Sequence, residues 1–284
     1  MTVLLAGLCT VDLVQRVAEL PSPGEKVQSS SVAVAAGGPA TNAAVTVAAL
    51  GAAAVLVTAL GRHPLAGLAR ADLAAHGVRV VDTAPEQDEP PAVSAVAVRD
   101  RDGERTVVSR NAGTDLGTMP SEIPDGVRAV LVDGHLPRLA VGVARWARSR
   151  GIPVVLDAGS WKPVMDELLP LVDIAACSAH FRAPGADLRE RGVPTVIVTN
   201  GPRPVRWESG GEVGEIEVPA VRAVDTLGAG DVWHGALVYG ALVYGVGRLR
   251  LPELIRFANE VAAAKVRHAG PRAWVSEVAK LGVR

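Results

Sequence analysis

Short apolar runs alternate with longer stretches of helical periodicity along nearly the whole chain. The runs predict buried strands at Thr2–Leu8, Ala54–Ala59, Val78–Asp82, Val127–Val132, Ile152–Asp157, Val172–Ala176 and Thr195–Thr199. The periodic stretches predict helices at Pro39–Leu50, Leu65–His76, Leu136–Arg150, Lys162–Leu169, Ala229–Gly245 and Leu251–His268. This alternation indicates an α/β fold: a three-layer α/β/α sandwich with a mostly parallel central sheet.

Two stretches break the alternation. Glu25–Ala35 alternates polar and apolar residues, and Ala92–Arg110 contains two strand-like arms around a turn at Asp100–Gly103. We expect both stretches to form a small separate β-sheet. A further antiparallel pair, Pro204–Trp207 and Glu215–Val218, predicts an edge hairpin of the main sheet.

Length and composition describe a folded protein with a sizeable core. The chain has 284 residues, of which 49% are hydrophobic and 21% charged, so wholesale disorder is excluded. The length is compatible with two domains or with one α/β domain that carries an insert. The net charge is −1, without long single-sign blocks, and only 3% of residues are aromatic. Nucleic acid and anionic membrane are therefore excluded as main partners.

The cysteines and the first residues bear on location. Cys9 and Cys177 form no CxxC pair and no cluster with histidine, so neither a disulfide framework nor a zinc site is indicated. The first residues lack the basic head and cleavage site of a signal peptide, and Asp12 comes too early for a membrane span. We expect a cytoplasmic protein.

The strongest chemical signal is the segment Asp225-Thr226-Leu227-Gly228-Ala229-Gly230-Asp231 directly before a long helix. The small residues Gly228–Gly230 let the backbone approach an anion, and their N–H groups are the unpaired donors of a helix N-terminus. This pattern favours phosphate binding. Asp231 beside these donors suits a base that accepts the proton of an attacking hydroxyl. On spacing alone, it is equally a charge that stabilises the helix N-terminus by about 0.3–1 kcal/mol.

A second pattern opens the first buried helix. Gly37 and Gly38 allow a tight turn, Pro39 suits the first helical turn, and Asn42 lies one turn into an Ala/Val helix. Asn42 either contacts ligand hydroxyls or caps neighbouring backbone. Asp12 follows the first strand, where ligands bind in parallel sheets. It is either a sugar-binding carboxylate or a residue of a surface turn.

Taken together, residues 37–51 (GGPATNAAVTVAALG) and 225–231 (DTLGAGD) resemble the two signatures of the ribokinase-like (PfkB) carbohydrate kinase family. The resemblance covers essentially the whole chain, including the segment TVIVTNG at 195–201. A P-loop and a dinucleotide-binding GxGxxG after the first strand are both missing from the sequence. The resemblance implies one kinase domain over residues 1–284, with lid strands inserted at about 12–35 and 92–112.

The resemblance also implies an activity and a set of site residues. It implies transfer of the γ-phosphoryl group of ATP to a sugar hydroxyl, assisted by Mg²⁺. The catalytic positions would be the base Asp231 and an anion hole at Gly228, Ala229 and Gly230. The sugar-binding positions would be Asp12, Gly37, Gly38, Asn42 and, on the lid, Arg105. The nucleotide-binding positions would be Ser178, Thr199, Gly201 and Asn259. A site for K⁺ or another monovalent cation would use Asp225, the backbone of Leu227 and the loop 267–273.

The chain departs from the family at the stretch Cys177–Phe181, which has no glutamate where the family often carries the Asn-x-x-Glu motif that organises magnesium. Ser178 is similar to ketohexokinase-like members, which slightly favours ketoses among acceptors that include ribose, fructose and sugar acids. Cys177 and His180 are interpreted as structural, and His234 as a packing residue rather than a phosphate contact. The apolar lid valines Val93, Val96, Val98 and Val107 favour a homodimer through the outer face of the lid.

Three other functions remain open. A nucleoside kinase of the same fold is disfavoured because aromatic side chains that stack a base are scarce near Asp12 and the lid. A non-catalytic sugar or nucleotide sensor is favoured only by the altered stretch Cys177–Phe181, since Asp231 is present. An oxidoreductase lacks support because the dinucleotide fingerprint is missing.

Overall fold

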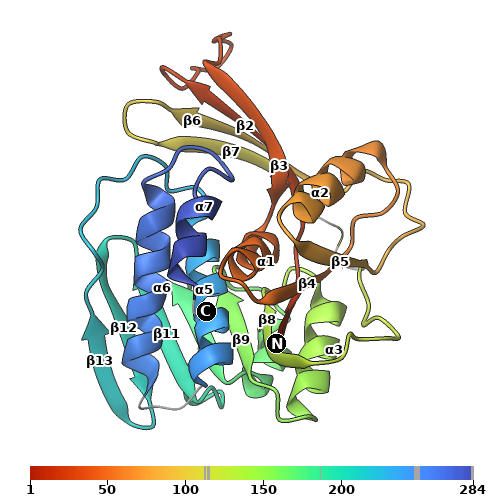
Figure 1. Ribbon diagram of the computed structural model, residues 1–284, viewed down its shortest axis with the longest axis vertical. Helices are drawn as coiled ribbons and strands as arrows, with labels where there is room; N and C mark the ends of the chain where they lie inside the picture. Colours follow the sequence, from red (N-terminus) through yellow and green to blue (C-terminus); the bar gives the residue numbers. More distant parts are fainter. Residues whose placement is uncertain (112, 114–115, 186, 246–249, 283–284) are drawn as a thin grey trace.

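A computed structural model of the chain (Figure 1) describes residues 1–111, 113, 116–185, 187–245 and 250–282. Within these ranges, nine strands form the central sheet in the order β13-β12-β11-β10-β9-β8-β1-β4-β5. All neighbouring pairs are parallel except β11–β12 and β12–β13. The strands are β1 Thr2–Ala6, β4 Ala53–Thr58, β5 Val78–Asp82, β8 Val127–Val132, β9 Val154–Ala158, β10 Ile174–Ser178, β11 Thr195–Asn200, β12 Arg203–Ser209 and β13 Glu212–Ile216.

Helices cover both faces of this sheet, which confirms the predicted α/β/α sandwich. The helices are α1 Pro39–Ala49, α2 Pro64–Ala75, α3 Pro137–Arg148, α4 Met165–Leu168, α5 Ala229–Tyr244, α6 Leu251–Val266 and α7 Val275–Val278. Val3 and Leu5 of β1 pack with α1, α5 and α6, whereas Leu4 and Ala6 pack with α3 and α4. A strand buried on both faces is apolar throughout, which is why the sequence shows unbroken apolar runs.

Helices α1 and α5 pack against each other unusually closely. A Cβ atom at Gly235 of α5 would lie 2.7 Å from the carbonyl oxygen of Ala43 and 2.8 Å from the Cβ of Thr46. Glycine at 235 therefore permits this approach. Because α5 is buried along most of its length, its all-round apolar sequence reflects burial. The close packing fixes the N-terminus of α1 relative to that of α5.

A second sheet stands at one end of the molecule, above α1, α5 and α6 (Figure 1). Its strand order is β3-β2-β6-β7. The strands are β2 Thr10–Val17, β3 Ser31–Gly37, β6 Ala92–Arg99 and β7 Arg105–Arg110. Val14, Val96 and Val98 are buried on its inner face, where Leu227 packs against them. The small sheet is therefore docked onto the segment that precedes α5.

The predicted composition of the small sheet needs two corrections. Residues 18–30, all described, contain no strand, and the second member of the sheet is β2. Of the predicted stretch Glu25–Ala35, residues 25–30 form no strand, and β3 begins only at Ser31. Asp12 consequently lies within β2 rather than in a turn after β1. The predicted limit of 112 falls outside the described residues.

The lid valines also divide differently from the prediction. Val96 and Val98 face inward, so they do not belong to an outer surface. The outer face instead carries a row that crosses all four strands through directly paired residues. Its members are Val34, Leu13, Ala95 and Val108. Val34 and Val108 are 48% and 72% exposed.

The helix predicted at Lys162–Leu169 is shorter than expected. It spans only Met165–Leu168 and continues as a 3₁₀ turn over Leu169–Leu171. Pro170 lacks an N–H group and its ring clashes with the preceding turn, so the α-helix ends there. The edge hairpin of the main sheet is confirmed as β12 and β13. Among the described helices, none is long and apolar enough to cross a bilayer.

Candidate active site

The turn before α1 is held against two other segments. Gly38 caps α1 with φ 97°, and a Cβ atom there would lie 2.5 Å from the carbonyl oxygen of Leu8. A Cβ atom at Gly37 would lie 1.9 Å from Oδ2 of Asp12. Position 38 therefore requires glycine, whereas a Cβ atom at Gly37 would displace the carboxylate of Asp12. The turn places Asp12 directly beside the N-terminus of α1.

The N-terminus of α5 supplies the expected anion donors. Gly228 caps this helix in the left-handed conformation (φ 72°). The N–H of Val232 donates to the carbonyl of Gly228 at 3.0 Å, so Gly230 and Asp231 precede the first i to i−4 bond of the helix. The N–H of Ala229 donates instead to the carbonyl of Thr226 at 3.2 Å. Of the three predicted donors, Gly228 and Gly230 are the better placed to receive an anion.

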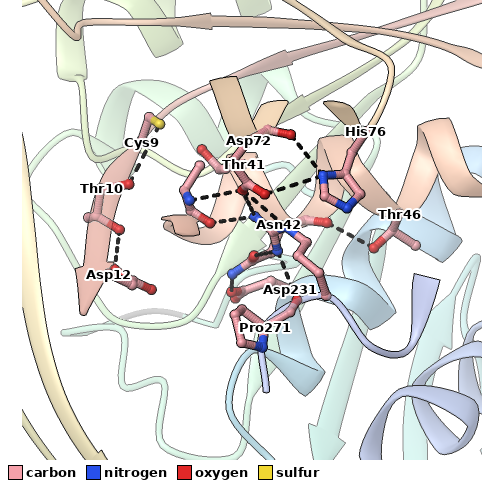
Figure 2. A network of polar contacts seen from close by, with 12 residues as sticks. Cys9, Thr10, Asp12, Thr41, Asn42, Thr46, Asp72, His76, Asp231 and Pro271 are labelled. Carbon is pink, nitrogen blue, oxygen red and sulfur yellow. Dashed lines mark hydrogen bonds and ion pairs between the residues drawn. The ribbon is translucent and has the colours of Figure 1, made fainter. Parts of the chain in front are cut away.

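Asp231 and Asn42 bring the two helix N-termini together (Figure 2). Nδ2 of Asn42 donates to Oδ2 of Asp231 at 2.8 Å. Nη1 of Arg272 donates to Oδ1 of Asn42 at 3.1 Å, and Nη2 of Arg272 donates to Oδ2 of Asp72 at 2.8 Å. Arg272 thereby fixes which end of the Asn42 amide faces Asp231. The two predicted site residues are joined directly.

A buried ion pair lies behind Asp231. Nδ1 of His234 is 2.9 Å from Oδ2 of Asp157, at the carboxyl end of β9, and both side chains are 5% exposed. Burial opposes ionisation of Asp157, but the charge and hydrogen bond of His234 outweigh it and lower the pKa of Asp157. Burial likewise disfavours the imidazolium, but Asp157 and Asp231 together raise the pKa of His234. His234 packs inside the protein, in agreement with its interpretation from sequence.

The pKa of Asp231 is raised to about 7, first by burial and then by the negative charge of Asp157. The hydrogen bond from Asn42 and the charge of His234 act in the opposite direction. A helix N-terminus by itself lowers the pKa of a carboxylate, so the buried surroundings outweigh it here. A carboxylate with a pKa near neutrality is well suited to accept a proton.

Asp12 faces the same small cavity as Asn42 and Gly228. The hydroxyl of Thr10 donates to Oδ1 of Asp12, and burial raises the pKa of the Asp12 carboxyl. The cavity has a volume of only about 20 Å³. Above it, Nη1 of Arg105 donates to Oγ1 of Thr226 at 2.9 Å. Arg105 thereby joins the small sheet to the segment that precedes α5.

The residues expected near a nucleotide lie at the carboxyl ends of neighbouring strands. Oγ of Ser178 donates to the carbonyl of Gly159 at 2.9 Å, and Oγ1 of Thr199 donates to the carbonyl of Cys177 at 3.3 Å. Gly201 forms the turn after β11 with φ 57°. These strand ends share one edge of the sheet with Asp157.

Asn259 is the exception among these residues. Its side chain is 2% exposed, accepts from Nε1 of Trp233 at 2.7 Å and donates to the carbonyl of Glu217 at 3.0 Å. Both ends of its amide are therefore occupied within the protein. Asn259 therefore joins α6 to α5 and to the segment after β13. Its amide has no group left to contact a nucleotide, so it would affect a nucleotide pocket only by positioning these elements.

Two metal sites were expected here, one for Mg²⁺ and one for a monovalent cation at Asp225 and Leu227. The described residues contain no group of three His, Cys, Asp or Glu side chains that could hold a metal ion. Asp225 is buried, and its carboxylate accepts from the N–H groups of Leu227 and Gly270, both at 2.9 Å. The N–H of Leu227 thus faces the Asp225 carboxylate, and the ammonium group of Lys265 lies 3.6 Å from Oδ1 of Asp225.

Sequence reasoning missed three charged residues of this region: the buried Asp157 and Lys265, and the partly buried Arg272. Asp157 carried a usable signal, because it is an acidic residue at the end of a predicted parallel strand. Lys265 interrupts the apolar face of a helix, which is a weaker signal. Arg272 lies in a loop, and nothing in its local sequence indicates that it contacts Asn42.

Comparison with known proteins gives a consistent result. The model of the pfkB family of carbohydrate kinases matches residues 2–277. Ribokinase of Bacillus subtilis is 26% identical over 273 residues, which cover 92% of this chain and 91% of that protein. An ATP-dependent ribose-1-phosphate kinase of Halopiger xanaduensis is 28% identical over 291 residues, with 95% and 93% covered. The structure of Arabidopsis thaliana ribokinase complexed with ribose and ATP has a TM-score of 0.74 at 24% identity, covering 98% of this chain and 97% of that one.

Proposed function

Because this chain belongs to the pfkB family of carbohydrate kinases, we propose that it transfers the γ-phosphoryl group of ATP to a hydroxyl of a small sugar, with Asp231 as the general base. The observation that carries this proposal is the convergence of Asp231, Asn42 and Asp12 beside the N-terminus of α5. The arrangement combines a base, hydroxyl-binding groups and anion donors. These are the elements that phosphoryl transfer to an alcohol requires.

In the proposed reaction, a sugar hydroxyl oxygen attacks the γ-phosphorus while its proton passes to Oδ1 or Oδ2 of Asp231. The bond between the γ-phosphorus and the bridging oxygen breaks, and ADP leaves. The N–H groups of Gly228 and Gly230 face the charge on the transferred group, and the α5 dipole adds to their effect. Since the transition state is loose, orientation of the hydroxyl by Asp231 contributes alongside its basicity.

For the sugar, Asp12 and Asn42 are the proposed hydroxyl-binding side chains, and Gly37 and Gly38 let the backbone approach. A carboxylate can accept hydrogen bonds from two neighbouring hydroxyls. Arg105 is the residue of the small sheet proposed to reach the sugar. Ribose is the first acceptor to test, since a ribokinase is among the relatives, and ketoses and sugar acids follow.

For the nucleotide, we propose that the strand ends at Ser178, Thr199 and Gly201 lie beside the phosphates. Magnesium would enter as part of the MgATP substrate and would neutralise phosphate charge, since Mg²⁺ in such enzymes is held largely by phosphates and water. ATP as donor and the two free cysteines support the expected cytoplasmic location.

We further propose that the small sheet acts as a lid. Its inner valines rest on Leu227 and its Arg105 contacts Thr226, so closure brings Asp12 towards Asp231. A closed lid would keep water, which competes with the sugar hydroxyl, away from the phosphoryl group.

A direct test is release of ADP by the purified protein with MgATP and a panel of pentoses, ketohexoses, sugar acids and nucleosides. Sugar-dependent release is the expected result, and the best acceptor identifies the substrate class. A response to nucleosides alone would favour the nucleoside kinase. Binding of ATP without turnover on any acceptor of the panel would contradict the proposed activity and favour a sensor.

The pH dependence of this activity follows from the surroundings of Asp231. A base must be deprotonated to act, and burial together with Asp157 raises the pKa of Asp231 to about 7. We expect kcat/KM to rise with pH and level off above about pH 7, with an approximately tenfold loss per pH unit well below it. The residual activity of Asp231→Asn should lack this inflection. A profile of the unaltered enzyme that is flat between about pH 5.5 and 8 would contradict the assignment.

We also propose that a second copy of the chain covers the outer face of the small sheet. The apolar row Val34–Leu13–Ala95–Val108 crosses this face, and Val32 beside it is 64% exposed. Aligned apolar side chains on an exposed sheet face favour association with an identical face through a two-fold axis. The lid of one protomer would then be supported by the lid of the other.

Light scattering at micromolar concentration is expected to give twice the chain mass of 29.3 kDa. Val108→Lys should yield monomers, because two lysines would meet across the two-fold axis. Val213→Lys is the matched control, since Val213 is 76% exposed on the distant edge strand β13. A monomeric unaltered protein, or a Val108→Lys protein that stays dimeric, would exclude this interface.

A further inference from the structure

A buried lysine lies directly below the segment that precedes α5. The side chain of Lys265, near the end of α6, is 2% exposed. Its Nζ donates to the main-chain carbonyl of Asp225 at 2.8 Å and lies 3.6 Å from Oδ1 of the same residue. One ammonium group therefore serves both the backbone and the carboxylate of Asp225.

This arrangement gathers three segments around one carboxylate. Asp225 accepts from Leu227 on its own segment and from Gly270 in the loop after α6, while Lys265 approaches from the helix itself. Leu227 is followed by Gly228, whose left-handed conformation begins α5. The position of the anion donors thus depends on the Asp225 cluster. Lys265 lines the cavity, but its charge is paired with Asp225.

Burial of a lysine is costly unless its charge is matched. Burial lowers the pKa of Lys265, and the positive charge of Arg105 acts in the same direction. Asp225 and, more weakly, Asp231 oppose this change. Because the charge of Lys265 is paired with Asp225, removing either partner would leave a buried charge uncompensated.

The residues around Asp225 do not fit a free monovalent cation. The family resemblance implies such an ion bound through Asp225, the backbone of Leu227 and the loop 267–273. The carbonyl and carboxylate oxygens of Asp225 are the natural ligands in that set, and both already face the ammonium of Lys265. A second cation beside Lys265 would meet its positive charge in a buried site, where repulsion is weakly screened.

We propose that Lys265 is a positioning residue that supplies, from within the chain, the positive charge for which related kinases use a bound monovalent cation. The kinase would consequently be independent of K⁺. The effect of Lys265 on catalysis rests on the proposed function. Its effect on thermal stability does not, and it can be measured as Tm without any activity.

The first experiment compares the unaltered protein in KCl, NaCl and choline chloride at equal ionic strength. We expect ADP release to differ by less than about twofold among the three salts, and Tm to be the same in all of them, since only general screening acts. A gain of about fivefold or more on adding K⁺ would overturn the inference, because it would require a vacant cation site.

The second experiment removes the ammonium group. Lys265→Met keeps most of the side chain and leaves the oxygens of Asp225 open to an ion. In choline we expect activity to fall by about tenfold or more, and K⁺ should restore at least about fivefold, because the anion donors lose and regain their support. K⁺ should also raise the Tm of this variant and not that of the unaltered protein.

Lys280→Met is the matched control, since Lys280 is exposed and the chemical change is the same. It should behave as the unaltered protein in every salt. If K⁺ neither activates nor stabilises Lys265→Met, the inference is wrong; should that variant fail to fold, the salt comparison on the unaltered protein decides. If no sugar is phosphorylated at all, the Tm comparison still tests Lys265 separately from the proposed activity.

Discussion

Replacement of Asp231 by asparagine is expected to lower kcat by a factor of about 10²–10⁴, the usual contribution of a positioned base. Asparagine cannot accept the hydroxyl proton, yet its Oδ1 can still accept the hydrogen bond that Asn42 donates to Asp231 at 2.8 Å. The side chain therefore keeps its place while losing its basicity. Steady-state ADP release with the best acceptor of the panel measures the effect.

Sugar and nucleotide binding should stay within a few-fold in this variant, and Tm should not fall, since a carboxylate whose pKa is raised by burial gains little from ionising in the folded state. Asp125→Asn is a suitable control, because Asp125 is exposed at the opposite end of the strands, before β8. Turnover close to that of the unaltered enzyme in Asp231→Asn would mean that another group accepts the proton.

The parts of the site that were predictable from sequence are those with a local chemical signature. Asp231, Asn42 and Gly38 lie at helix N-termini, and such ends need particular residues within a few positions of one another. Asp157 and Arg272 act through contacts with residues distant in sequence. Asp157 meets His234, and Arg272 meets Asn42 across 230 positions. Only the fold brings these pairs together, so a local sequence pattern cannot predict them.

The same distinction separates the strands that were predicted from the one that was missed. Val127–Val132 is apolar and buried at every position except Arg128, so it stands out as an apolar run. β2 has an inner face that carries Asp12 and Arg16 beside Val14, so its alternation of apolar and polar residues is irregular. The polar residues that β2 carries on its inner face thus obscure its strand pattern in the sequence. Local rules are expected to fail where function requires polar residues at positions that packing alone would make apolar.

The charges around Asp231 act together rather than singly. Asp157 raises the pKa of Asp231 and His234 lowers it, so the buried pair behind the proposed base acts on its pKa in both directions. Asp12 adds a further negative charge on the sugar side. Hydroxyl groups that bind Asp12 would offset this charge, which links occupation of the sugar site to the basicity of Asp231.

Replacement of Asp12 by alanine is expected to lower kcat/KM for the sugar by about 10²–10³. A hydrogen bond to a charged group contributes about 1.5–3 kcal/mol, and a carboxylate that binds two hydroxyls loses both. The Michaelis constant for ATP should change little, because Asp12 lies on the inner face of the small sheet, at the Asn42 side of the cavity. Initial rates with one substrate varied and the other saturating separate the two effects.

Asp12→Asn tests whether charge or shape is lost, since the amide keeps one acceptor for the Thr10 hydroxyl and should give an intermediate loss. Asp100→Ala is the matched control, because Asp100 is 42% exposed, pairs with Arg16, and neither residue lines the cavity. A loss confined to the sugar and absent from Asp100→Ala would support Asp12 as a sugar-binding residue. An equal rise in the Michaelis constant for ATP would instead mean that Asp12 holds the lid, whose displacement weakens both substrates.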